Sequence, residues 1–441
     1  MSARTFYIEN LGCAKNQVDG EGMVCVLEDS GWRLVDQAEE AALIIVNTCG
    51  FIGAAKKEAL DTLLNFRKLY PAKKIIAAGC LAERYGQQLF SSLVEADGIF
   101  GNRDIRRIAE LARSLDSGRT VLLPENYGGP PARRKTFSRR GSVYIKAAEG
   151  CDNRCSFCAI PLIRGGLKSR PAEEITAEIK SFLSRGAAEF NIVAQDLGAW
   201  TGRDDSGGLF DLARAILEIP GDYWIRFLYI HPEHFPRNIL RLCEEDARLL
   251  PYFDLPFQHA SFPILKAMGR RADSEENLRL IGDIRQAAPD AVIRSTFLLG
   301  FPGETEKDFQ ALLDFQEKAA FDWLGCFTYS PEEDTPAQAL HRKKDLRVPA
   351  KTAKERKKIV EQRQTAITEK RFDRFTGRTA ELLVEEAVEG EELCLARAWF
   401  QAPEVDGLTV LHAEEGEKPP PGTRLRAKLV RRNGFDMEAV M

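Results

Sequence analysis

The sequence has no long hydrophobic run. No stretch of its 441 residues stays apolar over the roughly 18 to 20 positions that a membrane-spanning helix needs. Residues 1–10 also lack the basic region, apolar stretch and small-residue cleavage site of a secretory signal. We therefore expect a soluble, cytoplasmic protein that has no membrane partner.

The chain also has little net charge and too few cysteines for a disulfide scaffold. Its 62 Lys/Arg and 66 Asp/Glu give a net charge of −4, so no overall basic field favours phosphate binding. Ten cysteines in a chain of this length do not form the dense framework of small secreted domains. We expect free thiols in a reducing compartment, where they are available as metal ligands.

Three cysteines form one compact motif, C-x-x-x-C-x-x-C, at Cys151, Cys155 and Cys158; we call them the contiguous trio. Thiolates select iron-sulfur clusters, zinc or cuprous copper. Zinc sites usually add a second C-x-x-C or an H-x-x-x-H element, and the sequence has neither. Four-iron clusters that only carry electrons are normally closed by four cysteines. Three therefore favour a cluster with one iron open to a small molecule.

The chain is long enough for two or three domains, and its composition divides it into three. Residues 1–130 alternate short β-branched runs, at 5–10, 43–48, 74–79 and near Ile99, with amphipathic stretches. This alternation predicts a doubly wound parallel α/β domain. A connector rich in Gly, Pro and basic residues, 128–135, then marks a domain boundary.

The second and third regions predict a partial barrel and a small β-domain. Within 137–372, six strand candidates alternate with helical stretches, which predicts a partial (β/α)6 barrel; the strands are expected at 143–147, 189–194, 224–229, 253–257, 292–299 and 322–329. A long basic helix is expected at 351–375. The last segment, 376–441, has short strands and polar turns, which is typical of a small antiparallel β-barrel.

A second set of cysteines follows the first three strands. Cys13, Cys49 and Cys80, the dispersed trio, each stand at or just beyond a strand end and beside a glycine. The carboxyl ends of parallel strands share one edge, where ligands collect, so the three thiols can converge. Each taken alone is more often a buried core thiol. Together, three strand-end cysteines beside glycines leave open both core packing and a second three-ligand cluster. Cys25, Cys243, Cys326 and Cys394 show no such grouping.

Several motifs resemble those of methylthiotransferases of the radical S-adenosylmethionine (SAM) superfamily. They are Leu11-Gly12-Cys13-Ala14-Lys15-Asn16, Asn47-Thr48-Cys49, Ala78-Gly79-Cys80, and the contiguous trio with Phe157 before its last cysteine. The resemblance implies two [4Fe-4S] clusters, a radical SAM barrel and a TRAM-like terminal barrel. It also implies that a reduced first cluster cleaves SAM to a 5′-deoxyadenosyl radical, and that the second cluster provides a sulfur that another SAM methylates. An electron donor is then required.

The resemblance also suggests further SAM contacts at the strand ends of the barrel. They are Phe157 in the cysteine loop, Gln195 and Asp196 after the second strand, Gln258 after the fourth, and Gly300 after the fifth. For Gly300 an ordinary strand-to-helix turn is an equal alternative. Arg170 can pair with a carboxylate or lie at the surface, and His231 and His259 can carry protons or line the cavity.

The superfamily offers two substrates, an adenosine of transfer RNA and an aspartate of small-subunit ribosomal protein twelve. Residues 376–441 contain 8 Lys/Arg and 13 Asp/Glu, so this barrel repels RNA and suits a basic ribosomal protein. We expect methylthiolation of the aspartate β-carbon, with the protein bound through the acidic barrel. The basic stretches 133–140 and 351–375 keep transfer RNA as an alternative. A non-catalytic iron-sulfur or zinc protein that binds ribosomes is a second alternative.

Overall fold

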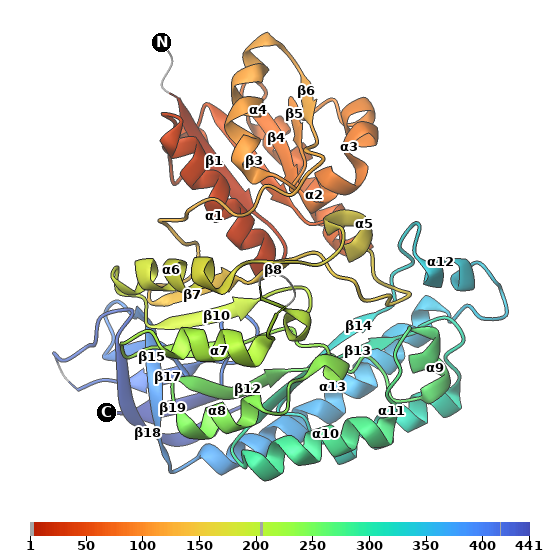
Figure 1. Cartoon of the computed structure of the whole chain (residues 1–441), viewed down its shortest axis with the longest axis vertical. Helices are drawn as coiled ribbons and strands as arrows, with labels where there is room; N and C mark the ends of the chain where they lie inside the picture. The colour runs from red at the N-terminus through yellow and green to blue at the C-terminus, as the bar shows by residue number, and fades with distance from the viewer. Residues whose placement is uncertain (1–3, 203–205, 415) are drawn as a thin grey trace.

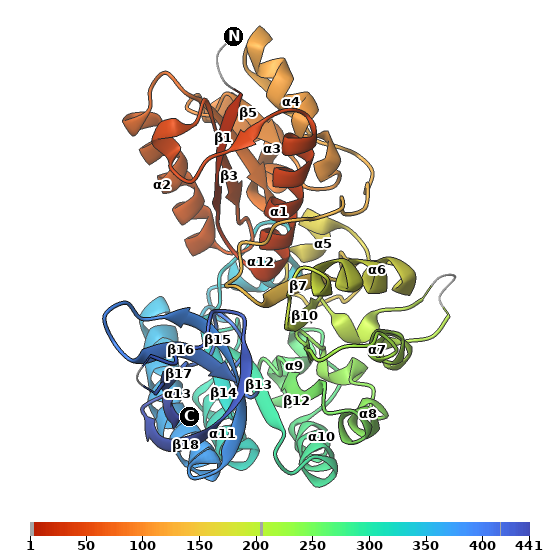
Figure 2. The ribbon, with the colours of Figure 1, turned by 90° about the vertical axis from the view of Figure 1, so that its left-hand side faces the viewer.

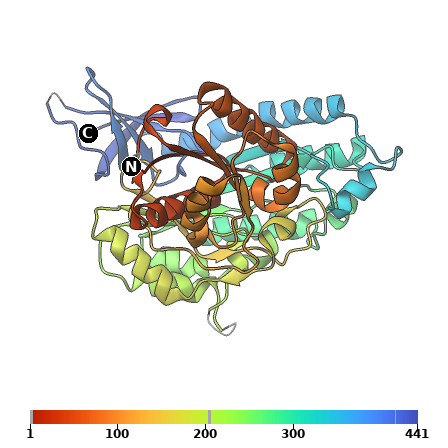
Figure 3. The same cartoon turned by 90° about the horizontal axis from the view of Figure 1, so that it is seen from above.

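The computed structural model describes residues 4–202, 206–414 and 416–441. Figure 1 shows three parts along the chain: an N-terminal α/β domain, a central domain beneath it, and a C-terminal β-barrel beside the central domain. Seen from above, the N-terminal domain overlies the central one (Figure 3). No helix within these residues is long and apolar enough to cross a membrane.

The N-terminal domain is a parallel sheet with helices on both faces, as expected. The strand order is β2-β1-β3-β4-β5-β6, with bounds β1 Thr5–Asn10, β2 Arg33–Leu34, β3 Leu43–Thr48, β4 Lys74–Gly79, β5 Gly98–Phe100 and β6 Thr120–Leu122. One face packs against α1 (Ala14–Asp29) and α4 (Ile108–Ser114), the other against α2 (Gly53–Leu69) and α3 (Cys80–Ser92). Every residue of β3 is buried, because a strand covered on both faces needs a continuous apolar run.

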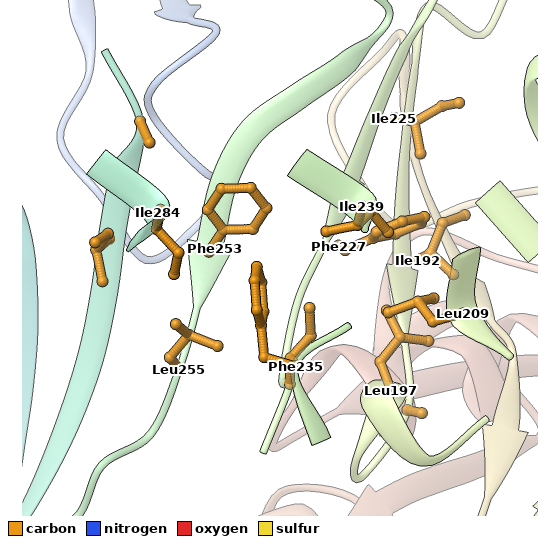
Figure 4. Packing of buried hydrophobic residues seen from close by; sticks show 14 of the residues in the cluster. Ile192, Leu197, Leu209, Ile225, Phe227, Phe235, Ile239, Phe253, Leu255 and Ile284 are labelled. Atoms are coloured by element: carbon orange, nitrogen blue, oxygen red, sulfur yellow. The ribbon is translucent and has the colours of Figure 1, made fainter. Parts of the chain in front are cut away.

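The central domain confirms the partial barrel. Its six parallel strands follow the order β14-β13-β12-β11-β10-β7, with bounds β7 Ser142–Lys146, β10 Glu189–Val193, β11 Trp224–Phe227, β12 Leu249–Asp254, β13 Val292–Leu299 and β14 Trp323–Thr328. The covering helices are α6 Ala172–Leu183, α7 Leu209–Leu217, α8 Ile239–Glu245, α10 Ser274–Ala287 and α11 Glu306–Ala319. Figure 4 shows the core between strands and helices, where Phe235 meets Phe253 edge to face with 5.2 Å between ring centroids.

One strand was placed wrongly from the sequence. The fourth strand was expected at 253–257, whereas β12 begins at Leu249 and ends at Asp254. Pro251 lies inside it, at an irregularity where Leu249 and Phe253 pair with Ile225 and Phe227. Proline is tolerated at such bulges because no ladder hydrogen bond is lost there. The proline interrupts the pattern that would otherwise have revealed the strand.

Shorter elements complete the central domain near its contact with the N-terminal domain. They are β8 Ala148–Glu149, β9 Lys168–Ser169, α5 Ile160–Arg164, α9 Phe262–Ala267 and α12 Pro336–His341. The long helix α13, Ala350–Phe372, runs along β14 and leads to the C-terminal barrel. Its buried face is partly polar: Gln364 and Thr368 donate to the carbonyl oxygens of Phe321 and Asp322.

The C-terminal domain is a closed five-stranded barrel in the order β15-β16-β17-β19-β18. The bounds are β15 Thr379–Ala387, β16 Leu393–Ala398, β17 Thr409–His412, β18 Arg424–Asn433 and β19 Asp436–Val440. All pairings are antiparallel except β17 with β19, which is parallel. Figure 2 shows this barrel against the central strands.

A buried ion cluster joins the C-terminal barrel to the central domain. Glu189 of β10 accepts hydrogen bonds from Arg397 of β16 at 2.5 Å, Arg226 at 3.1 Å and Ser142 at 2.7 Å. Although burial opposes ionisation, the two guanidinium groups lower the pKa of Glu189 to about 2. Trp224 and Tyr252 add apolar contact at the same joint. The C-terminal barrel is therefore anchored to the inner side of the central sheet.

Candidate active site

All six cysteines of the two trios line one cavity of about 390 Å³ between the N-terminal and central domains. The contiguous trio comes from the loop after β8 and the dispersed trio from the edge of the N-terminal sheet. The structure thus brings together two sets of thiols that lie about 70 or more positions apart in the sequence. Phe157, Gln195, Asp196 and Gln258 line the same cavity.

The dispersed trio stands where strands end and helices begin. Cys13 is the N-cap of α1, Cys80 is the first residue of α3, and Cys49 follows β3 directly. The positive end of a helix dipole favours a thiolate at Cys13 and Cys80, because both stand at the N-terminus of a helix. Although burial opposes ionisation, the Lys15 and Arg164 cations hold the pKa of the Cys13 thiol below its ordinary value.

An asparagine network explains why the chain folds this way around Cys13 and Cys49. Asn16 donates to the carbonyl oxygens of Leu11 at 2.6 Å and Asn47 at 3.2 Å. In return Asn47 donates to Asn10 Oδ1 and to the carbonyl oxygen of Asn16, both at 2.7 Å. These hydrogen bonds join the end of β1, the start of α1 and the end of β3. They therefore fix the positions of the two segments that carry Cys13 and Cys49.

The neighbouring glycines serve chain packing. A Cβ at Gly12 would lie 3.0 Å from Cys49 Cβ, and one at Gly50 would lie 2.8 Å from the carbonyl oxygen of Cys80. Gly79 has φ +92°, and a Cβ there would lie 2.7 Å from the carbonyl oxygen of Thr48. These glycines let the three cysteine-bearing segments approach one another.

Cys80 has two donors of its own. Arg164 of α5 donates to Cys80 Sγ at 3.1 Å and Asn102 donates at 3.4 Å. Burial nevertheless raises the pKa of the Cys80 thiol to about 12. Charged and polar donors around a ligand orient it and tune its affinity for metal, so Arg164 and Asn102 support this thiolate when metal is bound.

Arg164 also belongs to a buried ion network that joins the two domains. It contacts Asp19 of α1 at 2.9 Å and Glu149 of β8 at 2.8 Å. Lys146 of β7 pairs with the same two carboxylates. On the other side, Glu332 pairs with Lys56 and Arg84 of the N-terminal domain; these contacts are 2.8 and 2.7 Å long. Two sets of ion pairs therefore join the N-terminal and central domains around the cavity.

The loop of the contiguous trio is held by backbone and side-chain hydrogen bonds. The amide of Cys151 donates to the Gly165 carbonyl oxygen at 3.1 Å, and that of Ser156 donates to the Met268 carbonyl oxygen at 2.9 Å. Burial raises the pKa of all three thiols, that of Cys158 to about 12. Loading the site with metal must therefore release protons.

Asp196 anchors this loop. Its oxygens accept from Asn153 Nδ2 at 2.6 Å, from the amides of Gly198 and His231, and from His234 Nδ1 at 2.6 Å. A carboxylate offers about four acceptor positions, so none is left for the amino group of SAM. The Oε1 atom of the adjacent Gln195 is buried and has no hydrogen-bond partner among the described residues. Gln195 is therefore the better placed of the two to accept from a ligand.

Two cavity residues have a strained backbone. Tyr229, just after β11, has φ 62°, and Gln258, after β12, has φ 69°. A left-handed conformation costs a side-chain-bearing residue roughly 1–3 kcal/mol and is often found at functional sites. Both residues line the cavity, which supports the choice of Gln258 and adds Tyr229, a residue that the sequence did not single out.

Three other sequence candidates lie outside the cavity lining. Gly300 (φ +75°) packs against α13, where an added Cβ would lie 2.4 Å from Ala353 Cβ, and its amide donates to Glu304 at 2.7 Å. The turn interpretation therefore fits Gly300 better than SAM binding. Arg170 is buried and donates to Glu178 and to the Lys146 carbonyl oxygen. His259 is fully buried beside Glu304, whereas His231 does line the cavity.

Three cations line the cavity, and the sequence assigned no role to any of them. Arg164 is neutralised by Asp19 and Glu149. Nε and Nη1 of Arg270 are buried without a hydrogen-bond partner in the described parts of the chain. The Lys15 ammonium lies 3.2 Å from the centroid of the Tyr229 ring, and burial lowers its pKa. No sequence signal beyond the motif around Cys13 points to these side chains.

The donor set fits two iron-sulfur clusters and SAM. Three thiols face the cavity from each side, and soft thiolates are the ligands that such clusters require. Within the described ranges no three Cys, His, Asp or Glu side chains gather closely enough to hold a single metal ion. The unpaired Arg270 and Gln195 groups match the carboxylate and amino group of SAM.

Comparisons with known families match the three domains in turn. Residues 5–101 match the uncharacterized protein family UPF0004, residues 145–315 match the radical SAM superfamily, and residues 376–441 match the TRAM domain. Among solved structures, the radical SAM methyltransferase TsrM from Kitasatospora setae has a TM-score of 0.56 at 16% identity, covering 76% of this chain and 74% of that one. This likeness concerns the fold alone.

Close relatives share one name. The ribosomal protein uS12 methylthiotransferase RimO of Treponema denticola is 44% identical, over 97% of this chain and 99% of that protein. The protein of the same name from Desulfosudis oleivorans is 40% identical over 98% of each. Identity of this extent, together with the three domain matches and the paired trios, shows that the chain belongs to the RimO family of radical SAM methylthiotransferases.

Proposed function

We propose that this chain methylthiolates the β-carbon of an aspartate in small-subunit ribosomal protein uS12. The observation that carries the proposal is the meeting of two three-cysteine sets in one cavity. An unactivated C–H bond cannot be opened by acid-base chemistry at neutral pH, so cofactors must do the difficult step. When bound, SAM and the two [4Fe-4S] clusters supply the radical and the methylated sulfur.

The residues of the chain then have separate tasks. The contiguous trio holds the cluster that serves SAM cleavage, and Gln195 and Arg270 orient SAM beside it. The dispersed trio holds the cluster that serves sulfur transfer, with Arg164 and Asn102 supporting Cys80. Aromatic side chains, Phe157 and Phe327 among them, line the cavity and exclude water from a reactive intermediate.

The acidic end of the C-terminal barrel is the surface we assign to uS12. Exposed glutamates without ion-pair partners among the described residues gather on the β15–β16 turn and the loop after β17: Glu389, Glu391, Glu392, Glu414 and Glu417. Lys418 donates to the carbonyl oxygens of Val388 and Glu391, so the two segments are adjacent. Complementary charge of this kind speeds encounter with a basic protein. A ribosomal substrate places the activity in the cytoplasm, where an external electron donor is required.

The stretch 133–140 no longer favours transfer RNA. Arg133 is buried and pairs with Glu21 and Glu178, while Arg134 and Lys135 pair with Asp29 and Glu28. These pairs within the chain weaken the case for phosphate binding by the stretch, and Arg139 likewise pairs with Glu386. Exposed Arg140 and the exposed face of α13 are the remaining arguments for an RNA substrate.

Mass spectrometry of uS12 and transfer RNA from cells lacking this chain tests the proposal. We expect the uS12 aspartate to lose its methylthio group, while modified adenosine in transfer RNA stays unchanged. Complementation with the wild-type chain should restore the uS12 modification, and the Cys49→Ala variant should not. Loss of the RNA modification with uS12 intact would reverse the choice of substrate.

A second measurement separates an enzyme from a ribosome-binding protein. Anaerobically reconstituted protein should contain about eight irons and eight sulfides, as two cubes require, and should release 5′-deoxyadenosine from SAM on reduction. A non-catalytic binding protein would release none.

A further inference from the structure

Apart from its six thiols, the cavity is lined by more cations than carboxylates. Apart from the thiols, its charged lining consists of Lys15, Arg164, Arg270 and one carboxylate, Asp196. Arg164 is satisfied by buried carboxylates, and Asp196 is satisfied by four hydrogen bonds. Lys15 and Arg270 therefore face the cavity without a carboxylate partner among the described residues. A buried charge is normally paired with an opposite charge, so both cations can accept an anionic ligand.

Among the described residues, Lys15 and Arg270 act on different trios. Arg270 acts electrostatically on Cys155 and Cys158 of the contiguous trio, and on His231. Lys15 lies two residues after Cys13 of the dispersed trio, and its side chain reaches Tyr229 of the central domain. The reaction must hold two carboxylates, that of SAM and that of the substrate aspartate. Arg270 stands beside the cluster that serves SAM, which leaves Lys15 for the other carboxylate.

Burial and a contact with the Tyr229 ring fix the position of the Lys15 side chain. Its side chain is 8% exposed, and its ammonium rests 3.2 Å from the centroid of the Tyr229 ring. Tyr229 reaches that place with a left-handed backbone, φ 62°. A cation over an aromatic face is stabilised without being neutralised, so the ammonium remains able to bind an anion.

Among the described residues, the carboxylate that acts most strongly on Lys15 is not within ion-pair distance of it. Asp254 influences Lys15, but it accepts from the Tyr229 amide at 3.2 Å and lies 3.8 Å from Arg294 Nε. Asp254 is also absent from the cavity lining. In the described part of the chain, Lys15 thus has no carboxylate within ion-pair distance.

We propose that Lys15 binds the side-chain carboxylate of the substrate aspartate and so places the β-carbon between the two trios. This inference rests on the proposed function, because it concerns the same site. The β-carbon is one covalent bond from the carboxylate carbon, so a fixed carboxylate leaves the reacting C–H bond little freedom. The same contact makes the enzyme prefer aspartate to asparagine, whose neutral amide gains less from a buried ammonium.

An ordinary alternative is that Lys15 only balances the negative charge of the dispersed trio and its cluster. The two roles differ in what removal of the charge would change. Charge balance predicts altered iron content or an altered signal of the second cluster, whereas substrate binding predicts altered discrimination between peptides.

The test uses reconstituted holoenzyme with SAM bound and two uS12 peptides that differ only in aspartate or asparagine at the modified position. Anaerobic titration calorimetry should show that the wild type binds the aspartate peptide about 10- to 100-fold more tightly, as for a hydrogen bond to a charged group. Lys15→Met should bind both peptides equally weakly. Lys15→Arg should recover part of the preference, and Lys57→Met, at an exposed position of α2, should match the wild type.

Two results would overturn the inference. One is a Lys15→Met variant that keeps the preference for aspartate; the other is a variant that loses iron or the electron paramagnetic resonance signal of the second cluster, which would indicate charge balance. Failure of the proposed function looks different, because the wild type would then neither modify uS12 in cells nor distinguish the two peptides.

Discussion

The two cysteine trios do similar work but are built in opposite ways. The contiguous trio spans eight residues of a single loop, Cys151 to Cys158, whereas the dispersed trio draws on three strand ends between Cys13 and Cys80. The first is held by hydrogen bonds to Asp196, Gly165 and Met268, which all belong to its own domain. The second depends on the parallel sheet, on the asparagine network and on Arg164 from another domain. We therefore expect the contiguous trio to tolerate a mutation in another domain and the dispersed trio to be disrupted by one.

Removing one ligand from each trio gives the largest expected effect and tests whether their roles are separate. Cys155→Ala should abolish both SAM cleavage and methylthiolation, because three thiolates are the fewest that leave a single open iron. Cys49→Ala should abolish methylthiolation while SAM cleavage partly survives. The measurements are 5′-deoxyadenosine by chromatography and modified peptide by mass spectrometry. Equal loss of SAM cleavage and methylthiolation in both variants would contradict separate roles for the two trios.

Arg164→Met should show that the dispersed trio depends on another domain. The change removes the hydrogen bond to Cys80 Sγ and unbalances Asp19 and Glu149. We expect affinity for the second cluster to fall about 100-fold, near the upper end for lost supporting contacts. Iron content and electron paramagnetic resonance before and after chelation would measure this. Arg113→Met, at an exposed arginine of α4, is the matched control, and equal loss from both clusters would contradict the prediction.

Asn153→Ala should have a smaller effect on the contiguous trio. It removes the 2.6 Å hydrogen bond to Asp196, but the backbone anchors of the loop remain. A loss of about tenfold in affinity for the first cluster is expected, the lower end of the range for such contacts. The same chelation assay applies, with the exposed neighbour Arg154→Ala as control. A larger loss than in Arg164→Met would reverse the comparison.

Acid should weaken the joint between the C-terminal barrel and the central domain. The pKa of Glu189 falls from 4.5 to about 2 on folding, so its contribution to stability is complete above pH 4.5 and is lost as pH falls toward 2. Glu189→Gln leaves Arg397 and Arg226 without their carboxylate and should cost about 3–5 kcal/mol of unfolding free energy at pH 7. Urea unfolding from pH 7 downward should show this difference shrinking below pH 4.5. A difference that does not change with pH would contradict the assignment.

Much of the fold could be predicted because its signals are local. The strands β1, β3, β4 and β13 were placed at their observed bounds, since each is an apolar run between turn residues. The fourth barrel strand was misplaced because Pro251 sits in a bulge. Asp196 and Gly300 were chosen for their positions at strand ends. Such positions do not say whether a carboxylate is already saturated or a glycine already covered, and both were.

The sequence by itself determined the contiguous trio, because eight residues of one loop contain all of its ligands and their spacing. It also determined that three more thiols would stand at strand ends. Only the tertiary structure decided that the two trios face one cavity, that Arg164 reaches Cys80, and that Lys15 and Arg270 have no carboxylate partner among the described residues. These features depend on how the N-terminal and central domains pack together. Contacts between segments that are far apart in the chain produce no local sequence pattern from which they could be predicted.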